Sequence, residues 1–314
     1  MFVYLAKRLL YTIPIVFSVA LVCFMLVHLS PGDPLVSILP ADASAQLEAR
    51  LREQYGFDRP LPVQFWIWIT NALGGDLGNS IANGRPVLSE VLNAVGNTLL
   101  LACAASILGF ALGMFFGLVA GYFRDTWIDK LATSIAIAGV SVPHYWLGMV
   151  LVIIFSVQLN WLPAVGAGSG SWTWTWAHVQ YLILPAVTMA VIPMGIVTRT
   201  VRALVGDILS NDFVDALRAK GLGERRVFAH VVKNAAPTAI AVMGLQLGYL
   251  LGGSILIETV FSWPGTGFLL NTAIFQRDLP LLQGTILVLA LFFVFLNLAV
   301  DLLQAMIDPR IKRG

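Results

Sequence analysis

Ionisable side chains are scarce in the long apolar stretches of this chain. The acidic residues and the mid-span histidine that lie in or beside such stretches are His144, Glu258 and Asp301. Proton-coupled transporters typically carry relays of acidic or histidine side chains inside the membrane, but no two of these three share one helical face. The chain also has no HExxH sequence, no paired carboxylates within one stretch and no glycine-rich phosphate loop. The sequence therefore predicts neither catalysis nor an energy source of its own, and it indicates that another protein supplies the driving force.

The cysteines and the other histidines have ordinary structural interpretations. Cys23 and Cys103 each lie in an apolar run, without the spacing of a metal site or a disulfide framework. They are expected to act as small apolar side chains. His28 and His230 are expected at an interface or in solvent, and His178 in a loop. No metal site is predicted.

The composition indicates a chain whose surface mostly does not face water. Of its 314 residues, 58% are hydrophobic and only 11% are charged, and the mean hydropathy is +0.83. A soluble domain usually carries about 25% charged residues. The net charge of +2 gives no indication of a nucleic-acid partner. These values predict an integral membrane protein in contact with lipid.

Six apolar stretches are long enough to cross about 30 Å of hydrocarbon, which takes roughly 20 helical residues. The fold class predicted is therefore an all-α integral membrane protein with six transmembrane helices in a single permease-type domain, residues 1–314. The first stretch is expected to be an uncleaved helix, because no small-x-small cleavage site follows it. The stretches are residues 9–29, 97–122, 131–157, 181–201, 238–257 and 283–307.

The distribution of Lys and Arg predicts the orientation. With the N-terminus in the cytoplasm, 14 of the 19 basic residues fall in cytoplasmic segments, and the outer loop 160–180 has none. Both termini are therefore expected to be cytoplasmic. This orientation places a large outer loop at residues 30–96 and the longest cytoplasmic loop at residues 202–237.

Two helices carry glycine at every fourth position. Glycine costs about 1 kcal/mol in a helix interior, but in a membrane a row of small residues lets two helices approach closely. The rows could pack within this chain or against a second subunit, and the sequence does not separate the two. They are Gly109, Gly113, Gly117 and Gly121 in the second stretch, and Gly244, Gly248 and Gly252 in the fifth.

Prolines are expected to interrupt the third and fourth stretches, at Pro143, Pro185 and Pro193. Each removes a backbone donor and leaves a carbonyl unpaired, and such carbonyls are tolerated at membrane depth only inside protein or beside water. Either a plain kink or a polar lining fits this pattern. For the lining of a translocation path, the candidates are Ser141, Pro143, His144 and Glu258.

The cytoplasmic loop contains a short amphipathic helix. Asp212 or Asn211 is the expected N-cap and Gly221 the residue just past the C-terminus. One face is expected to be apolar, with Phe213, Val214 and Leu217, and the rest charged or small, with Asp215, Ala216 and Arg218. A second short helix is predicted from Glu224 to Ala235, ending before Pro237. Such an element suits docking to a partner, although a helix lying on lipid headgroups has the same pattern.

This loop resembles the "EAA…G" loop of ATP-binding-cassette (ABC) importer permeases, through Asp215-Ala216-Leu217 and Gly221. Asp replaces the Glu and Leu the second Ala of that motif. Further segments, in their order along the chain, resemble the B-type permeases of the dipeptide/oligopeptide/nickel transport family. Within that family the chain looks closer to the dipeptide and glutathione members. These segments include Ser30-Pro31-Gly32-Asp33-Pro34, Gly75-Asp76-Leu77-Gly78-Asn79-Ser80, Ala219-Lys220-Gly221-Leu222, Lys233-Asn234-Ala235, the run from Glu258 to Gly267, Arg277-Asp278-Leu279-Pro280 and Asp308-Pro309-Arg310-Ile311.

The resemblance implies a type I ABC importer permease of the bacterial inner membrane. It implies four partners: a second homologous permease, two cytoplasmic ATPases that bind ATP and Mg²⁺, and a periplasmic or lipoprotein solute-binding protein. This chain itself would bind no cofactor. The substrate implied is a peptide, with nickel or another small solute as the alternative on the same scaffold.

Two other classes of protein fit this sequence less well. A proton-coupled secondary transporter is disfavoured by the lack of an acid relay and by the docking loop. An intramembrane enzyme would need facing catalytic residues or metal ligands in the spans, and the sequence has none in view.

Overall fold

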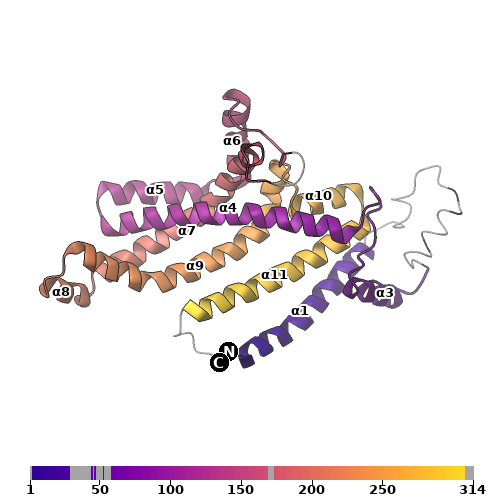
Figure 1. Ribbon diagram of the computed structural model, residues 1–314, viewed down its shortest axis with the longest axis horizontal. Coiled ribbons are helices and arrows are strands. Elements are labelled where there is room, and N and C mark those ends of the chain that lie inside the picture. The colour runs from indigo at the N-terminus through magenta and orange to yellow at the C-terminus, as the bar shows by residue number, and fades with distance from the viewer. Residues whose placement is uncertain are drawn as a thin grey trace. The chain divides into compact units, whose positions relative to one another are not determined.

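All regular elements in the described part of the chain are helices. The computed structural model describes residues 2–28, 58–168 and 173–307, together with residues 44, 46 and 52. The segments 30–34 and 308–311, which carry part of the family resemblance, lie outside the described residues. The elements are α1 (Phe2–His28), α3 (Leu61–Leu73), α4 (Val87–Tyr122), α5 (Trp127–Ser141), α6 (His144–Leu151), the π-helix η1 (Val152–Gln158), α7 (Trp176–Leu209), α8 (Asp212–Ala219), α9 (Glu224–Val260), α10 (Thr266–Gln276) and α11 (Leu279–Ile307) (Figure 1).

Four helices in the described residues are long and apolar enough to cross a membrane. They are α4, α7, α9 and the Leu279–Leu296 part of α11, and a fifth candidate is the bent pair Trp127–Ser141 and His144–Gln158. In α1, the apolar stretch that qualifies is shorter, Ile13–Met25. The expected all-helical membrane fold is thus confirmed with four or five such helices.

The third predicted span, residues 131–157, is not one straight helix. It is broken between Ser141 and His144, where the chain turns by 100° (Figure 1). Val142 is extended, with φ −83° and ψ 128°, and Pro143 then precedes the first residue of α6. The residue before a proline is disfavoured in the helical conformation. Pro143 therefore separates two helices, whereas a kink within one helix was one of the two expectations.

The other prolines do not end their helices, which corrects two predictions. Pro185 and Pro193 lie inside α7, and Pro237 lies inside α9, which runs on for 37 residues in total. Buried contacts on both sides of Pro237, by Val231, Ala235 and Ala239, hold the helix together across it. The segment 202–237 is therefore mostly the ends of α7 and α9, and residues 210–223 connect them.

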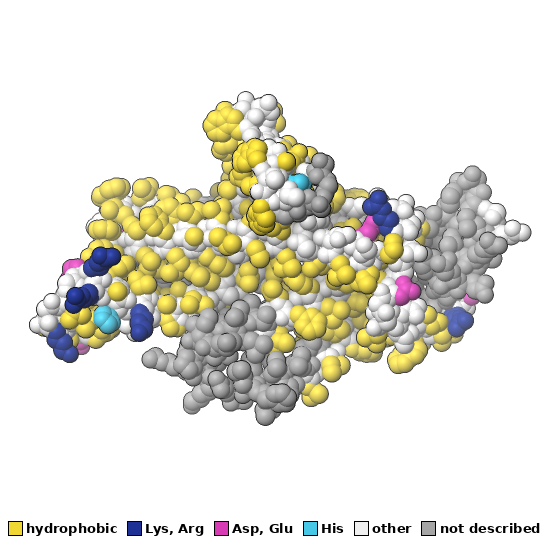
Figure 2. Space-filling view, viewed as in Figure 1, with side chains coloured by type: hydrophobic (Ala, Val, Ile, Leu, Met, Phe, Trp, Pro, Cys, Tyr) yellow, Lys and Arg dark blue, Asp and Glu magenta, His cyan; other side chains and the backbone are white. Residues whose placement is uncertain are grey.

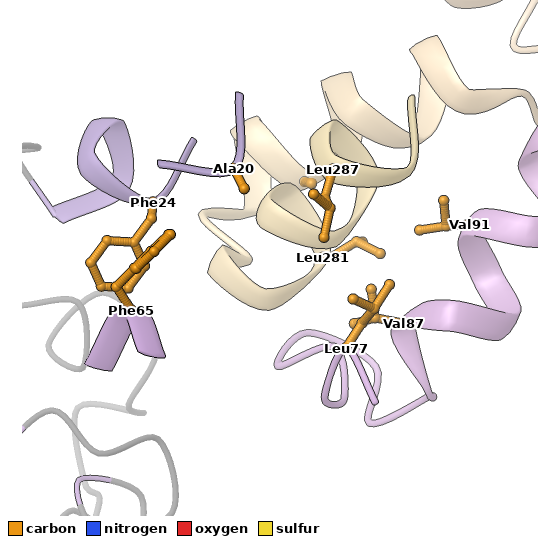
Figure 3. Close-up of a cluster of buried hydrophobic side chains, with 9 residues drawn as sticks. Ala20, Phe24, Phe65, Leu77, Val87, Val91, Leu281 and Leu287 are labelled. Carbon is orange, nitrogen blue, oxygen red and sulfur yellow. The ribbon is translucent and has the colours of Figure 1, made fainter. Parts of the chain in front are cut away.

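The chain divides into two compact units, Met1–Asn97 with Pro264–Leu296 and Thr98–Trp263 with Asn297–Lys312. A core of nine buried residues holds the first unit together (Figure 3). Phe24 of α1 meets Phe65 of α3 edge to face, with ring centroids 5.4 Å apart. The full set is Ala20, Phe24, Phe65, Leu77, Val87, Val91, Ala273, Leu281 and Leu287.

A buried carboxylate fixes the loop before α4 in this unit. Asp278 accepts hydrogen bonds from the Ser80 hydroxyl at 2.5 Å, from the Ala82 amide at 3.1 Å and from the Leu281 amide at 3.1 Å. The last bond caps the first turn of α11, whose free amides need an acceptor. The two sequence segments 75–80 and 277–280 therefore meet, although 198 residues separate Ser80 from Asp278.

In the second unit, α4 and α7 pack along the predicted glycine row. A Cβ atom built on any of the four glycines would lie 2.7–2.8 Å from an atom of α7. At Gly117, for example, the nearest atom is the Cβ of Val201. The row Gly109, Gly113, Gly117 and Gly121 is thus an interface within this chain. The second row differs: Gly252 is exposed with no atom within 4 Å of such a Cβ, and Gly244 and Gly248 are half-buried.

Candidate functional site

The best-defined candidate site is α8 and the turn that follows it. Asn211 is the N-cap, so of the two caps predicted Asp212 is the first helical residue, and Gly221 has a φ of +81° just after the helix. Glycine adopts this left-handed conformation without strain. Between these ends, Val214 is fully buried in a cluster with Val205 of α7 and Val227 of α9, and Leu217 packs against the same cluster. The cluster anchors α8 to the ends of α7 and α9.

The apolar face of α8 is divided between the protein and solvent. Phe213 is 40% exposed, whereas Val214 is completely buried and Leu217 is half-buried. The apolar face expected for Phe213, Val214 and Leu217 is therefore not all available to a partner, because Val214 and Leu217 complete the core beneath the helix. The surface left for a partner is Phe213 with its exposed neighbours Asp212, Asp215 and Ala216.

Arg218 fastens the end of α8 to the start of α9. Its Nε donates to Glu224 at 2.9 Å, and its Nη1 lies 3.4 Å from Asp215. The hydrogen bonds to Glu224 raise the pKa of Arg218 above its ordinary value. Since these groups are exposed, the contact orders the turn more than it stabilises the fold.

Charged side chains gather around α8. Figure 2 shows several Lys and Arg side chains there, while hydrophobic side chains cover much of the neighbouring helices. On α9 the exposed basic residues are Arg225, Arg226 and Lys233. This pattern is that of a helix bundle whose end leaves the lipid.

The candidates for a translocation path lie apart in the second unit. Ser141 is exposed at the end of α5, where its hydroxyl donates to the Ile137 carbonyl at 2.8 Å. His144, the first residue of α6, lines a small hollow between α6, α7 and α9. The other residues around the hollow are Met189, Ile192, Tyr249, Leu250, Gly253 and Ile257.

Glu258 does not line an open path in this structure. Its side chain is fully buried, and the Thr98 hydroxyl donates to its Oε1 at 2.8 Å. Thr98 belongs to α4 and Glu258 to the end of α9, so the carboxylate joins two helices. This placement assigns Glu258 a structural role.

A buried ion pair between α5 and α7 was not predicted from the sequence. Arg202 donates from Nε to Asp129 Oδ1 at 2.6 Å and from Nη2 to Oδ2 at 2.7 Å. The Asp129 side chain is 3% exposed and that of Arg202 31%. Asp129 also accepts from the Asp125 amide and the Thr133 hydroxyl. The one signal in the sequence was an acidic residue in the first turn of α5. Acidic residues are common at that position because they interact favourably with the helix dipole, so the signal does not indicate an ion pair.

Comparison with protein-family models matches nearly the whole chain. Residues 113–313 match the model described as "Binding-protein-dependent transport system inner membrane component". Residues 1–102 match "Binding-prot-dependent transport system membrane comp, N-term". The chain belongs to this family of transport components. This membership confirms the expected ABC permease class, and it makes the chain a multi-pass protein of the inner membrane.

Curated members of this permease family are similar over their full length. The chain is 42% identical over 310 residues, 98% of each chain, to "Glutathione transport system permease protein GsiC" of Escherichia coli (strain K12). The same values hold for the protein of that name in Salmonella typhimurium (strain LT2). Among solved structures, one of the inward-facing MetNI methionine ABC transporter has a TM-score of 0.56 at 17% identity, covering 69% of this permease and 96% of that chain. At that identity the likeness shows a shared fold.

Proposed function

We propose that this permease forms half of the translocation pathway of an ATP-driven importer of small peptides, and that glutathione or a similar peptide is its substrate. The observation that carries the proposal is the 42% identity, over 98% of both chains, to permeases of glutathione transport systems. The permease has no nucleotide-binding motif, so separate ATPase subunits bind ATP and Mg²⁺ and drive the cycle. A second homologous permease completes the pore, and a periplasmic or lipoprotein solute-binding protein delivers the peptide.

The helix α8 transmits the ATPase movement to the membrane helices. Support comes from its contacts: Val214 and Leu217 are packed against α7 and α9, so a force applied to α8 reaches both helices. Phe213 is left exposed at the surface and is the apolar anchor for the ATPase, with Asp212, Asp215 and Ala216 around it. Burying a phenylalanine side chain contributes about 1.5–3 kcal/mol.

Replacing Phe213 by aspartate is expected to uncouple the ATPases and leave the membrane fold intact. The Phe213 side chain is 40% exposed and does not belong to the buried cluster beneath α8, so the fold should tolerate its replacement. Affinity purification of the permease should retain less than a tenth of the ATPase bound by the wild type, or retain it with transport lost.

The matched control is Asp215→Asn, a polar change on the same helix, which should retain the ATPases. If α8 instead lies on lipid headgroups, Phe213→Asp will keep the ATPases and normal transport, and that result would refute the coupling role.

Six spans with both termini in the cytoplasm fit the permease best, counting α1 and the bent α5–α6–η1 segment as one span each. The asymmetry of Lys and Arg supports this orientation. A reporter enzyme active only outside the membrane should work when fused at Gly168 and be silent at Gly314. Activity at Gly314 would place the C-terminus outside the cytoplasm, and it would contradict either the orientation or the number of spans.

A further inference from the structure

The helix α3 lies in the predicted outer loop but has the composition of a membrane helix. None of its 13 residues is charged, and charged residues appear only outside it, at Asp58 and Arg59 before and Asp76 after. A helix that borders water normally carries polar and charged residues on its exposed face. Thirteen residues are too few to cross a membrane, and apolar helices of this length are typical of a protein core or a membrane interface.

The exposed face of α3 is apolar. Trp66 is 66% exposed and Leu73 is 83% exposed, and Val63 is exposed on the same side of the helix. The hydroxyl on this face belongs to Thr70, and it donates to the carbonyls of Trp66 and Ile67 at 2.8 and 2.9 Å. A threonine whose hydroxyl bonds back to its own helix needs no acceptor from water. This face therefore offers an apolar surface to whatever covers it.

The opposite face fixes the depth of α3 against α1. The Phe65 ring meets the rings of Phe24 and Phe17, with centroids 5.4 and 5.7 Å apart (Figure 3). Trp68 lies 6.1 Å from Phe24. Phe17 and Phe24 are seven residues apart, or about 10 Å along the helix axis, and both belong to the apolar stretch Ile13–Met25. Phe65 is therefore placed beside the apolar stretch of α1 and not beyond its end.

The exposed faces of α1 and α3 adjoin. Ile13, Phe17 and Val22 of α1 are large, apolar and exposed. Phe17 borders both faces, because its ring also contacts Phe65. In a multi-pass membrane protein, such a face on an apolar helix is one that lipid can cover. A surface that docks a water-soluble protein usually has a polar rim, and the absence of charge from α3 favours lipid over the solute-binding protein.

We propose that α3 lies in the outer leaflet of the membrane, with Trp66 and Leu73 against lipid, and not in the water outside the membrane. The inference rests on the proposed topology, in which α1 crosses the membrane and its second half lies in the outer leaflet. Tryptophan suits this place, because its ring is apolar and its N–H can reach the headgroup level. The lipid thus holds the start of the outer loop in place against α1.

The test uses a spin label at single cysteines in the complete complex, reconstituted in vesicles of phosphatidylethanolamine and phosphatidylglycerol. Cys23 and Cys103 are first changed to alanine. The labelled positions are Trp66→Cys on α3, Ile13→Cys on the exposed face of α1, and Asp58→Cys before α3. At each, collisions are measured with oxygen, which dissolves in hydrocarbon, and with chromium oxalate, which stays in water and is present on both sides.

The ratio of oxygen to chromium collisions at Trp66→Cys should exceed that at Asp58→Cys at least tenfold and lie within threefold of that at Ile13→Cys. A ratio equal to that at Asp58→Cys would mean contact with water. Few collisions with either reagent would mean cover by the solute-binding protein or the second permease. Either result overturns the inference and leaves the proposed topology standing if Ile13→Cys reports lipid. Water at Ile13→Cys as well would remove the proposed α1 span together with the inference.

A charge on the exposed face supplies a second readout. Thr70 is exposed, so water would tolerate a carboxylate there, whereas a carboxylate inside the membrane is costly. Thr70→Asp should lower the amount of assembled complex in the membrane at least threefold, and Thr70→Val should assemble as wild type. The matched control is Thr126→Asp at the exposed N-cap of α5, where aspartate is also a good cap. Wild-type amounts of Thr70→Asp would likewise overturn the inference.

Discussion

Replacing Gly117 by leucine is expected to remove nearly all correctly folded permease from the membrane. Even a Cβ atom at this position would lie 2.7 Å from the Cβ of Val201 and 2.9 Å from the Thr198 carbonyl oxygen. Both contacts are to atoms held by the α7 backbone, so relief requires α4 and α7 to separate. Separation would break the same contact at Gly113 and Gly121. Overpacking typically costs about 1–3 kcal/mol, and more where the backbone must move. Membrane-extracted protein that runs as a single species in size-exclusion chromatography should fall at least tenfold.

Gly252→Leu is the matched control for this prediction. It places the same side chain in a helix of the same unit, at an exposed position with no atom within 4 Å of the new Cβ. The chain should therefore fold as wild type. If the second glycine row meets the partner permease, Gly252→Leu will yield folded protein that fails to join the complex. Normal folding of Gly117→Leu would contradict the close packing of α4 on α7.

Removing Asp129 is expected to have the second-largest effect on folding. Asp129→Ala leaves the Arg202 guanidinium without the two hydrogen bonds it makes at 2.6 and 2.7 Å. Breaking a buried pair by deleting one partner costs roughly 3–5 kcal/mol. Because Arg202 keeps 31% of its side-chain surface exposed, we expect the lower end, about 3 kcal/mol. Thermal unfolding of the purified permease, followed by tryptophan fluorescence, measures the loss.

Two further variants separate the pair from other effects of the substitution. The double change Asp129→Leu with Arg202→Met removes both charges and should recover much of the lost stability. Arg218→Gln breaks an ion pair on the exposed turn after α8 and should shift the unfolding temperature little. An Asp129→Ala protein as stable as wild type would show that this contact contributes nothing to the fold.

Periodic patterns such as the glycine row could be recognised in the sequence, but the helices that pack against them could not be predicted. Four glycines at every fourth position predict a close helix contact. Each glycine destabilises the helix, and close packing of a second helix is the main gain that offsets this loss. That contact proved to be α7 of the same chain, at Val197, Val201 and Val205. Which helix fills a groove depends on tertiary packing, and no local pattern records it. The same limit hid the pair between Asp129 and Arg202, which lie 73 residues apart.

Local rules were least reliable at the prolines and on α8. Proline disfavours helix continuation, yet α9 passes through Pro237 because its buried residues there gain more from packing. On α8, successive side chains are about 100° apart, so the sequence shows that Phe213, Val214 and Leu217 share an arc. It does not show where the core meets that arc. The structure places Val214 inside and Phe213 outside.

Uptake by the reconstituted complex tests the central claim most directly. The permease, its partner permease, two ATPases and the solute-binding protein are assembled in vesicles with ATP enclosed, and accumulation of radiolabelled glutathione is followed. The account predicts accumulation against a gradient that requires ATP hydrolysis, persists when the proton gradient is collapsed, and is lost in Phe213→Asp. Accumulation that follows the proton gradient without ATP, or none for any small peptide, would contradict it.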